Sequence, residues 1–124
     1  MKFLLLIYTD DTLLEALPAG AFDQMMHGCI THADELKAQG TLIESQQLEH
    51  GSSARTVRVR DGRTSVVDGP FAETKEILGG YNLIEADSLD EAVKIAQEFP
   101  WIGTGSIEVR PVRDFEAVRR RVGA

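Results

Sequence analysis

The sequence predicts an α+β protein in which two helices pack on one face of an antiparallel sheet. Two observations lead to this prediction. Short apolar segments of strand length alternate with two segments whose apolar residues recur at the helical period. In the middle of the chain, two strand-like segments are joined by Asp61–Gly62, a favoured hairpin turn. The predicted order is therefore strand, helix, strand, hairpin, strand, helix, strand.

The first half of the chain supplies a strand, a helix and a second strand. Residues 2–9, KFLLLIYT, are an uninterrupted apolar run that is typical of a central strand. Residues 10–20 are expected to be a connection. Residues 21–39 are expected to be a helix, because their apolar residues form one stripe, and Gly40 suits a left-handed C-terminal cap. The stripe consists of Phe22, Met25, Met26, Cys29, Ile30, Ala33 and Leu36. Residues 41–48 are the next strand candidate.

The second half begins with the hairpin, residues 54–69. A strand is predicted at 81–86. Ser88 and Glu91 form a capping box, so a helix is expected to begin there and to end at Pro100. Its predicted buried face is Leu89, Ala92, Val93, Ala96 and Phe99. A last strand is expected at 106–112 and a short helix at 114–122.

Without the hairpin, this order is the split βαβ pattern of a ferredoxin-like fold. Two helices can cover only one face of such a sheet, so the other apolar face needs a partner. A symmetric homodimer is the economical solution. We therefore expect a single domain over residues 1–124, with 54–69 as an inserted hairpin and 113–124 as an Arg-rich C-terminal tail.

Composition narrows the possible partners. The formal net charge of −7 argues against nucleic acid as a direct partner. The basic tail is expected to be a solvated end, to pair with the acidic body, or to contact a partner. Cys29 is the only cysteine, so an intrachain disulfide and two-cysteine metal motifs are excluded. We expect no cofactor and no metal. The sequence has no apolar run long enough to span a membrane and no signal-peptide pattern at its start, so a cytoplasmic protein is expected.

Residues 68–76, DGPFAETKE, carry more charge than a turn requires. Gly69 and Pro70 predict a change of direction. Phe71 is expected to pin the loop to the core, and Asp68 to accept backbone N–H groups. The remaining residues, Glu73, Thr74, Lys75 and Glu76, are not explained by a turn. They favour either a latch between subunits or a site for a ligand.

If the segment is a site, its roles can be assigned. Crowded carboxylates raise each other's pKa values, so Asp68 or Glu73 would be the general acid or base. Lys75 and Arg110 would hold the negative charge of a small polar or anionic molecule. Further ligand-binding candidates are Glu76, Arg58 and His32. Salt bridges between subunits remain the alternative for Arg58, Arg60, Glu108 and Arg110.

Other reactive side chains are expected to be structural. His27 and His50 are expected at the surface, and the histidines lack a zinc-binding spacing. Cys29 lies in the apolar stripe and is expected in the core. Trp101 is expected to cap the core, with stacking on a ligand as the alternative.

The stretch VVDGPFAETKEILGGYNLIEADSLDEAVKIAQEFP, followed by GSIEVRPV, resembles the DGPF-domain branch of the YCII-related family. The opening segment and the hairpin pattern fit as well. The resemblance implies a ferredoxin-like dimeric α+β barrel. Some relatives are encoded beside, or fused to, extracytoplasmic-function sigma factors, which implies a regulatory context. The matching residues are Asp68, Gly69, Pro70, Phe71, Glu73, Thr74, Lys75, Glu76, Gly80, Glu108 and Arg110.

The wider YCII group is similar to enzymes that use a His–Asp pair. In this sequence Cys29 stands near the position of that histidine, and Phe99 precedes Pro100 where the aspartate would be. That mechanism is therefore not carried over. Binding of a small molecule and a non-enzymatic interaction module are the two remaining functional hypotheses.

Overall fold

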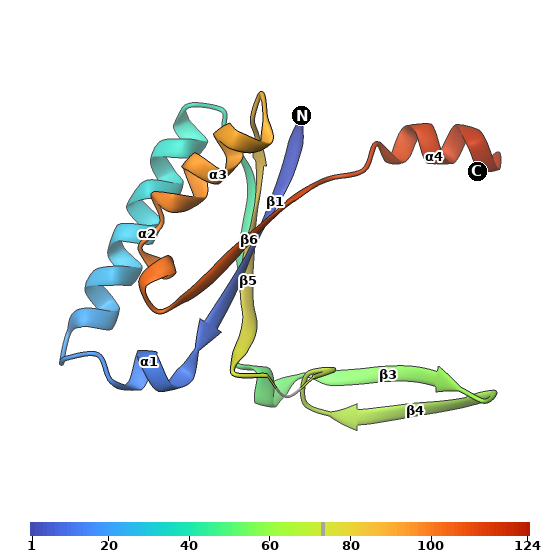
Figure 1. The fold of residues 1–124 in the computed structure, drawn as a ribbon, viewed down its shortest axis with the longest axis horizontal. Helices are drawn as coiled ribbons and strands as arrows, with labels where there is room; N and C mark the ends of the chain where they lie inside the picture. The colour runs from blue at the N-terminus through green and yellow to red at the C-terminus, as the bar shows by residue number, and fades with distance from the viewer. Residues whose placement is uncertain (73) are drawn as a thin grey trace.

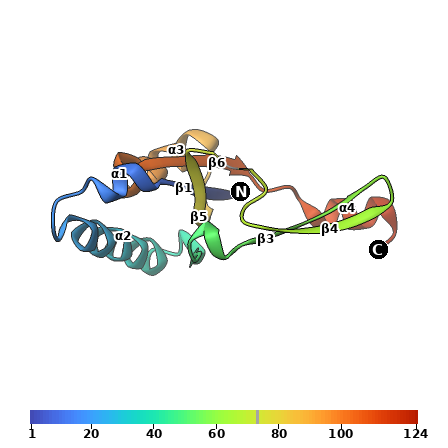
Figure 2. The same ribbon diagram turned by 90° about the horizontal axis from the view of Figure 1, so that it is seen from below.

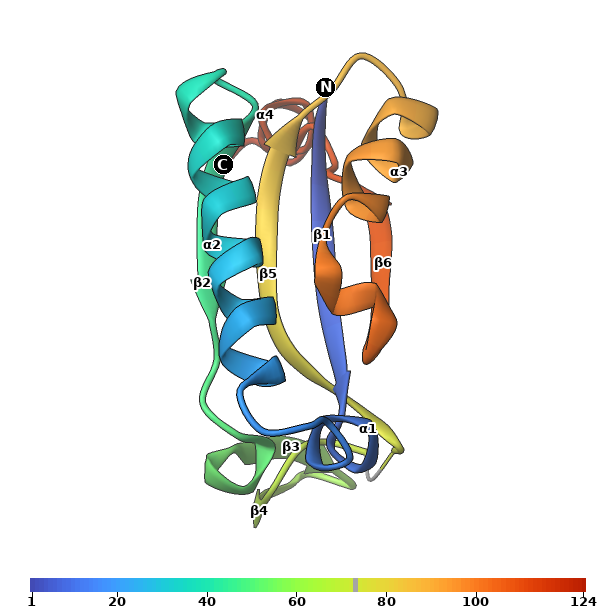
Figure 3. The ribbon, with the colours of Figure 1, turned by 90° about the vertical axis from the view of Figure 1, so that its left-hand side faces the viewer.

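The structure is a computed structural model that describes residues 1–72 and 74–124. It confirms the α+β class, with a four-stranded antiparallel sheet and a separate hairpin. The sheet has the order β2-β5-β1-β6 and is formed by β1 (Lys2–Asp10), β2 (Leu42–Gln47), β5 (Glu76–Glu85) and β6 (Gly105–Pro111). Two helices, α2 (Ala21–Ala38) and α3 (Leu89–Gln97), cover one face of this sheet (Figure 3).

The hairpin forms its own two-stranded sheet. Strands β3 (Arg55–Arg60) and β4 (Arg63–Asp68) pair antiparallel, and Asp61 and Gly62 both have positive φ, 53° and 74°. This turn confirms the hairpin prediction. The hairpin and the C-terminal helix α4 (Phe115–Val122) both extend from the side of the sheet that lacks helices (Figure 1). Figure 2 also shows the hairpin and α4 extending away from helices α2 and α3.

The core lies between the sheet and the two helices. Phe3, Leu5 and Ile84 are fully buried there. The helices add Cys29, Leu36, Ala92, Ile95 and Ala96, and Phe99 and Trp101 close one end. The predicted buried face of α3 is wrong in part. Leu89 and Val93 are 46% and 38% exposed. Ile95, which the predicted face leaves out, is buried instead.

Helix ends follow the caps that the sequence predicts. Gly40 has a φ of +79°, as a left-handed cap after α2 requires. Before α3, the Glu91 backbone N–H donates to the Ser88 hydroxyl at 3.1 Å, and the Glu91 carboxylate accepts from the Asp87 N–H at 3.0 Å. Capping chemistry therefore placed both helix boundaries correctly.

Two segments differ from expectation. The predicted connection after β1 contains a short helix, α1 (Asp11–Glu15), which begins because the buried Asp10 side chain accepts from the N–H groups of Thr12 and Leu13 at 3.0 and 3.3 Å. Strand β5 begins at Glu76 rather than at residue 81, because it continues to pair with the end of β1. Two 3₁₀ turns, η1 (Gly51–Ser53) and η2 (Pro100–Gly103), complete the chain.

The face of the sheet opposite the helices is mainly apolar along its two central strands. In β1 and β5 the residues that alternate with the core residues point to this open face and are partly exposed. They are Leu4, Leu6, Tyr8, Leu78, Tyr81 and Leu83. Polar residues of the edge strands, among them Glu44 and Glu108, flank this stripe. Within the described residues, no helix is long and apolar enough to cross a membrane.

Candidate functional site

The segment 68–76 connects the hairpin to β5 at one end of the sheet. Gly69 has a φ of +94°, so a residue with a side chain would be strained there. Asp68 does not accept backbone N–H groups as expected. Its Oδ1 lies 3.0 Å from Arg55 Nε across the base of the hairpin, and the Gly69 N–H donates to the Ala54 carbonyl instead. The hairpin ladder therefore holds this part of the segment.

The predicted contact of Phe71 with the core is wrong: the side chain is 77% exposed. The hairpin stands away from the helix-covered core, so no core lies within reach of this residue. The loop is fixed through its backbone, because Arg58 Nη2 donates to the Phe71 carbonyl at 2.8 Å. Thr56 Oγ1 likewise donates to the Gly69 carbonyl at 2.8 Å.

Lys75 and Glu76 tie the segment to neighbouring strands. Lys75 Nζ lies 3.7 Å from Oδ2 of the buried Asp10, although the lysine side chain itself is 78% exposed. Both carboxylate oxygens of Glu76 accept from the Ser106 hydroxyl at 2.9 Å. Glu73, the other acid or base candidate, lies outside the described residues. The acid–base role of Asp68 stays a prediction.

Arg110 and His32 lie apart from this segment. Arg110 pairs with Glu108 on the open face, four residues along β6 from Ser106. His32 lies on the helix-covered side, where its ring packs edge-on against Phe99 and its Nε2 is 3.4 Å from Glu98 Oε2. Among the described candidates, Asp68, Lys75, Glu76 and Arg58 therefore lie at one end of the molecule, whereas Arg110 and His32 lie elsewhere.

Gly80 has a packing role. A Cβ atom at this position would come within 2.7 Å of the Gln46 carbonyl oxygen, which is closer than real contacts allow. The absence of a side chain therefore lets β2 pair closely with β5.

A groove of about 730 Å³ runs beside the 68–76 segment. One wall is the start of the hairpin and the segment itself, and the other is the end of the open sheet face. Its lining includes Tyr8, Arg55, Pro70, Phe71, Thr74 and Glu76. Its volume lies within the range of roughly 300–1,000 Å³ that is common for small-molecule sites. We refer to this space as the motif groove.

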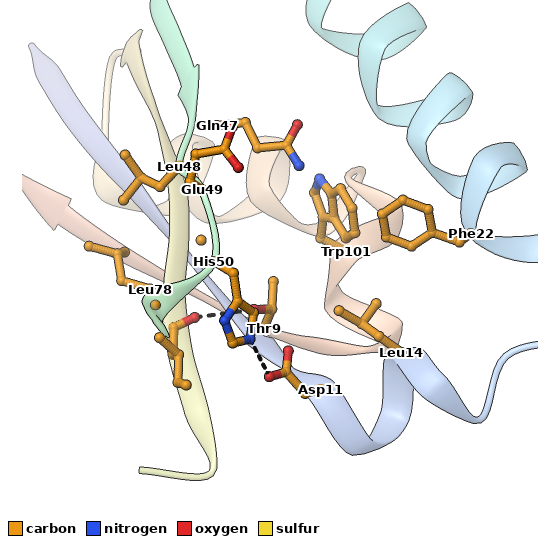
Figure 4. Close-up of a pocket in the computed structure, with 13 residues that line it drawn as sticks. Thr9, Asp11, Leu14, Phe22, Gln47, Leu48, Glu49, His50, Leu78 and Trp101 are labelled. Carbon is orange, nitrogen blue, oxygen red and sulfur yellow. Dashed lines mark hydrogen bonds and ion pairs between the residues drawn. The ribbon is translucent and has the colours of Figure 1, made fainter. Parts of the chain in front are cut away.

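A second space of about 440 Å³ lies between the end of the sheet and the helix layer (Figure 4). We refer to it as the inner cavity. Residues 48–51, Ile77 and Leu78 border both spaces. In the inner cavity His50 and Asp11 lie at one end, and the rings of Phe22 and Trp101 lie at another (Figure 4).

His50 and Asp11 form a close pair that the sequence did not indicate. His50 Nε2 lies 2.7 Å from Asp11 Oδ2, and the Ser52 N–H donates to His50 Nδ1 at 3.1 Å. Because Nδ1 accepts, the ring proton of neutral His50 resides on Nε2 and is donated to Asp11. The prediction of a plain surface histidine is therefore incomplete. No spacing signal could have found this pair, since 39 residues separate its members.

Two other ionisable groups have shifted properties. Burial raises the pKa of the Cys29 thiol, as expected of a core cysteine rather than a nucleophile. On the open face, the hydrogen bond from the Tyr81 hydroxyl to Glu44 raises the pKa of that phenol. Within the described part of the chain, no group of three or more His, Cys, Asp or Glu residues is placed to hold a metal ion.

Fold and site together define a small α+β protein with a ligand-sized groove beside an uncovered sheet face. The chain belongs to the YCII-related domain family, which residues 1–116 match. It is 36% identical over 114 residues to an uncharacterised protein of Rhizobium meliloti (strain 1021), covering 90% of this chain and 92% of that protein.

A solved structure also matches, at a TM-score of 0.47 and 15% sequence identity. It is the 5-chloro-2-hydroxyhydroquinone dehydrochlorinase of Burkholderia phenoliruptrix AC1100 in complex with 2,5-dihydroxybenzoquinone. The match covers 91% of this chain and 94% of the enzyme.

Proposed function

We propose that this protein is a homodimer that binds a small polar or anionic molecule in the motif groove. The observation that carries the proposal is the position of that groove, between the 68–76 segment and the open sheet face. A second subunit seated on the open face would wall the groove on its unprotected side. The order β2-β5-β1-β6 supports a ferredoxin-like fold, and two such sheets packed face to face would form a dimeric α+β barrel.

Charge distribution supports association with a second copy. Of the 13 basic and 20 acidic residues, eight basic and four acidic residues lie in the projecting segments 54–69 and 113–124. Those segments therefore carry +4, and the rest of the chain carries −11. Two copies that place their basic segments on each other's acidic body would be complementary in charge.

The chemistry around the motif groove favours a ligand with both a polar head and an apolar part. Tyr8, Pro70 and Phe71 provide apolar surface, whereas Thr74 and Glu76 provide polar groups. Arg55 lines the groove, and Lys75 and Arg58 lie beside it on the same segment and on the adjoining hairpin, where their charges would attract an anionic head.

Thermal shift and light scattering test this proposal together. Wild-type protein is expected to elute as a dimer, and its melting temperature is expected to rise with an anionic compound from a panel of carboxylates and phosphates. Lys75→Ala and Arg58→Ala should keep the dimer and lose the shift. Lys94→Ala, on α3, is the matched control. A monomer at micromolar concentration would refute the dimer, and the absence of any shift across the panel would refute the ligand.

A second candidate function is that of an interaction module whose hairpin clamps two subunits. The observation that favours it is the exposure of Val57, Val59, Val66 and Val67, each more than half exposed on the projecting hairpin. Apolar surface of this kind marks an interaction site. Replacing residues 55–68 by Gly-Gly should produce a monomer if the hairpin is the clamp. A dimer that survives this change would show that the open face alone suffices.

A further inference from the structure

The inner cavity combines acidic groups with an aromatic wall. Its lining includes Asp11 and His50 at one end, Glu49 beside Gln47 at another, and Leu14, Phe22 and Trp101 on the apolar side (Figure 4). The ring centroids of Phe22 and Trp101 are 6.0 Å apart, and the rings are tilted by 59°. Trp101 is 9% exposed, so its ring is a fixed part of the wall. All these residues belong to one protomer, and Glu49 and His50 also border the motif groove.

The charge of this lining is one-sided. Among the described residues that line the inner cavity, Asp11 and Glu49 are acidic and none is a lysine or an arginine. Both ring nitrogens of His50 already have partners, because Nδ1 accepts from the Ser52 N–H and Nε2 bonds to Asp11, so the ring offers no free donor to an anion. An anion would enter this space against two carboxylates. The inner cavity therefore selects against anions.

His50 positions Asp11. The bond between His50 Nε2 and Asp11 Oδ2 fixes the carboxylate, whose Oδ1 accepts no hydrogen bond from any residue in the described part of the chain. That oxygen is available to a ligand. The Asp11 side chain is 44% exposed, so a ligand can reach this carboxylate from solvent.

We propose that the inner cavity binds a small organic ammonium ion. The ammonium group would lie at Asp11, Glu49 would add to the negative charge of the lining, and the apolar body would pack against Leu14, Phe22 and Trp101. Carboxylates neutralise the charge, and aromatic faces attract cations through their quadrupole. This inference does not require the dimer, because the lining comes from a single protomer.

Trp101 is the only tryptophan of the chain, so its fluorescence reports directly on the inner cavity. The probes are benzylammonium, benzyl alcohol and benzoate, which share a phenyl ring and carry charges of +1, 0 and −1. Benzylammonium is expected to change the fluorescence saturably, with a Kd at least tenfold lower than that of benzyl alcohol. Benzoate is expected to bind more weakly than the alcohol. Equal or tighter binding of benzoate would overturn the proposal.

Variants assign the effect to the carboxylates. Asp11→Asn should reduce the preference for benzylammonium over benzyl alcohol to less than threefold while leaving the affinity for the alcohol unchanged. Glu49→Gln should reduce it about twofold to threefold, and it provides the test if Asp11→Asn fails to fold. Glu108→Gln, on the open face, is the matched control and should keep the full preference. A preference that survives both cavity variants would refute the proposal.

The role of His50 as a positioning residue has its own readout. His50→Gln retains an amide donor for Asp11 and should keep the preference, whereas His50→Leu should lose at least threefold of it. Equal behaviour of the two variants would refute this role. Neither dilution of the protein nor Arg58→Ala should change the benzylammonium affinity. Binding in the inner cavity can therefore be measured separately from anion binding in the motif groove and from dimer formation.

Discussion

Asp10 and Lys75 allow the structural and ligand-binding roles of the 68–76 segment to be separated. The buried Asp10 side chain caps α1 through two backbone hydrogen bonds and lies 3.7 Å from Lys75 Nζ. Asp10→Ala removes the cap and is expected to lower the free energy of unfolding by about 1–2 kcal/mol. Asp10→Asn keeps a capping oxygen and should cost less than about 1 kcal/mol.

Lys75→Ala should cost much less than Asp10→Ala. The lysine side chain is 78% exposed, so the ion pair is screened by solvent and contributes roughly 0–0.5 kcal/mol. Urea unfolding of the three single variants and of the Asp10→Asn, Lys75→Ala double variant measures each value and the coupling between them. A loss of about 2 kcal/mol in Lys75→Ala would refute the reasoning, because the lysine would then be structural and not free for a ligand.

Three further predictions concern stability and reactivity. Gly105→Ala would place a Cβ atom 2.0 Å from the Tyr8 carbonyl oxygen, so we expect a loss of more than about 2 kcal/mol in urea unfolding; a loss below 0.5 kcal/mol would contradict the strand geometry. Burial raises the pKa of the Cys29 thiol, so native protein at pH 8 should react with a disulfide reagent at least tenfold more slowly than urea-unfolded protein. The raised pKa of Tyr81 means that its bond to Glu44 stabilises the fold below the unfolded pKa of the phenol, about 10, and that this stabilisation is lost as the pH rises through the folded pKa. Ultraviolet titration should show this pKa falling in Glu44→Gln, and an unchanged titration would contradict the assignment.

Local chemistry made the two helices that cover the sheet, and the hairpin, predictable. Gly40 and Ser88 mark helix boundaries through caps that act within a few residues, and Asp61–Gly62 specifies its turn by backbone conformation alone. The start of β5 was not predictable in this way. Glu76 lies in a charged segment typical of a loop, and it becomes a strand residue only because it pairs with Asp10, far away in the sequence.

The candidate site was predictable only in part, for the same physical reason. Residues 68–76 stand out by their own composition, and Pro70, Phe71, Ala72, Thr74 and Glu76 line a groove. The exposure of Phe71 depends on the direction in which the hairpin projects, which no local pattern encodes. The approach of His50 to Asp11 depends on β2 and β1 both pairing with β5, so it is a product of sheet assembly.

The irregular pairing of β5 with β1 controls which residues face which side of the sheet. Ile7 pairs with Gly80 and Tyr8 with Leu78, so Gly79 is an extra residue in β5. After Gly79, the even-numbered residues of β5 (Gly80, Asn82 and Ile84) face the helices. Before it, the odd-numbered Ile77 does. Deletion of Gly79 would make Leu78 and Gly80 neighbours and restore regular alternation, so Ile77 and Leu78 would keep their present facings. One extra glycine thus reverses the odd–even pattern of β5 and allows its two halves to present residues of opposite parity to the helix layer.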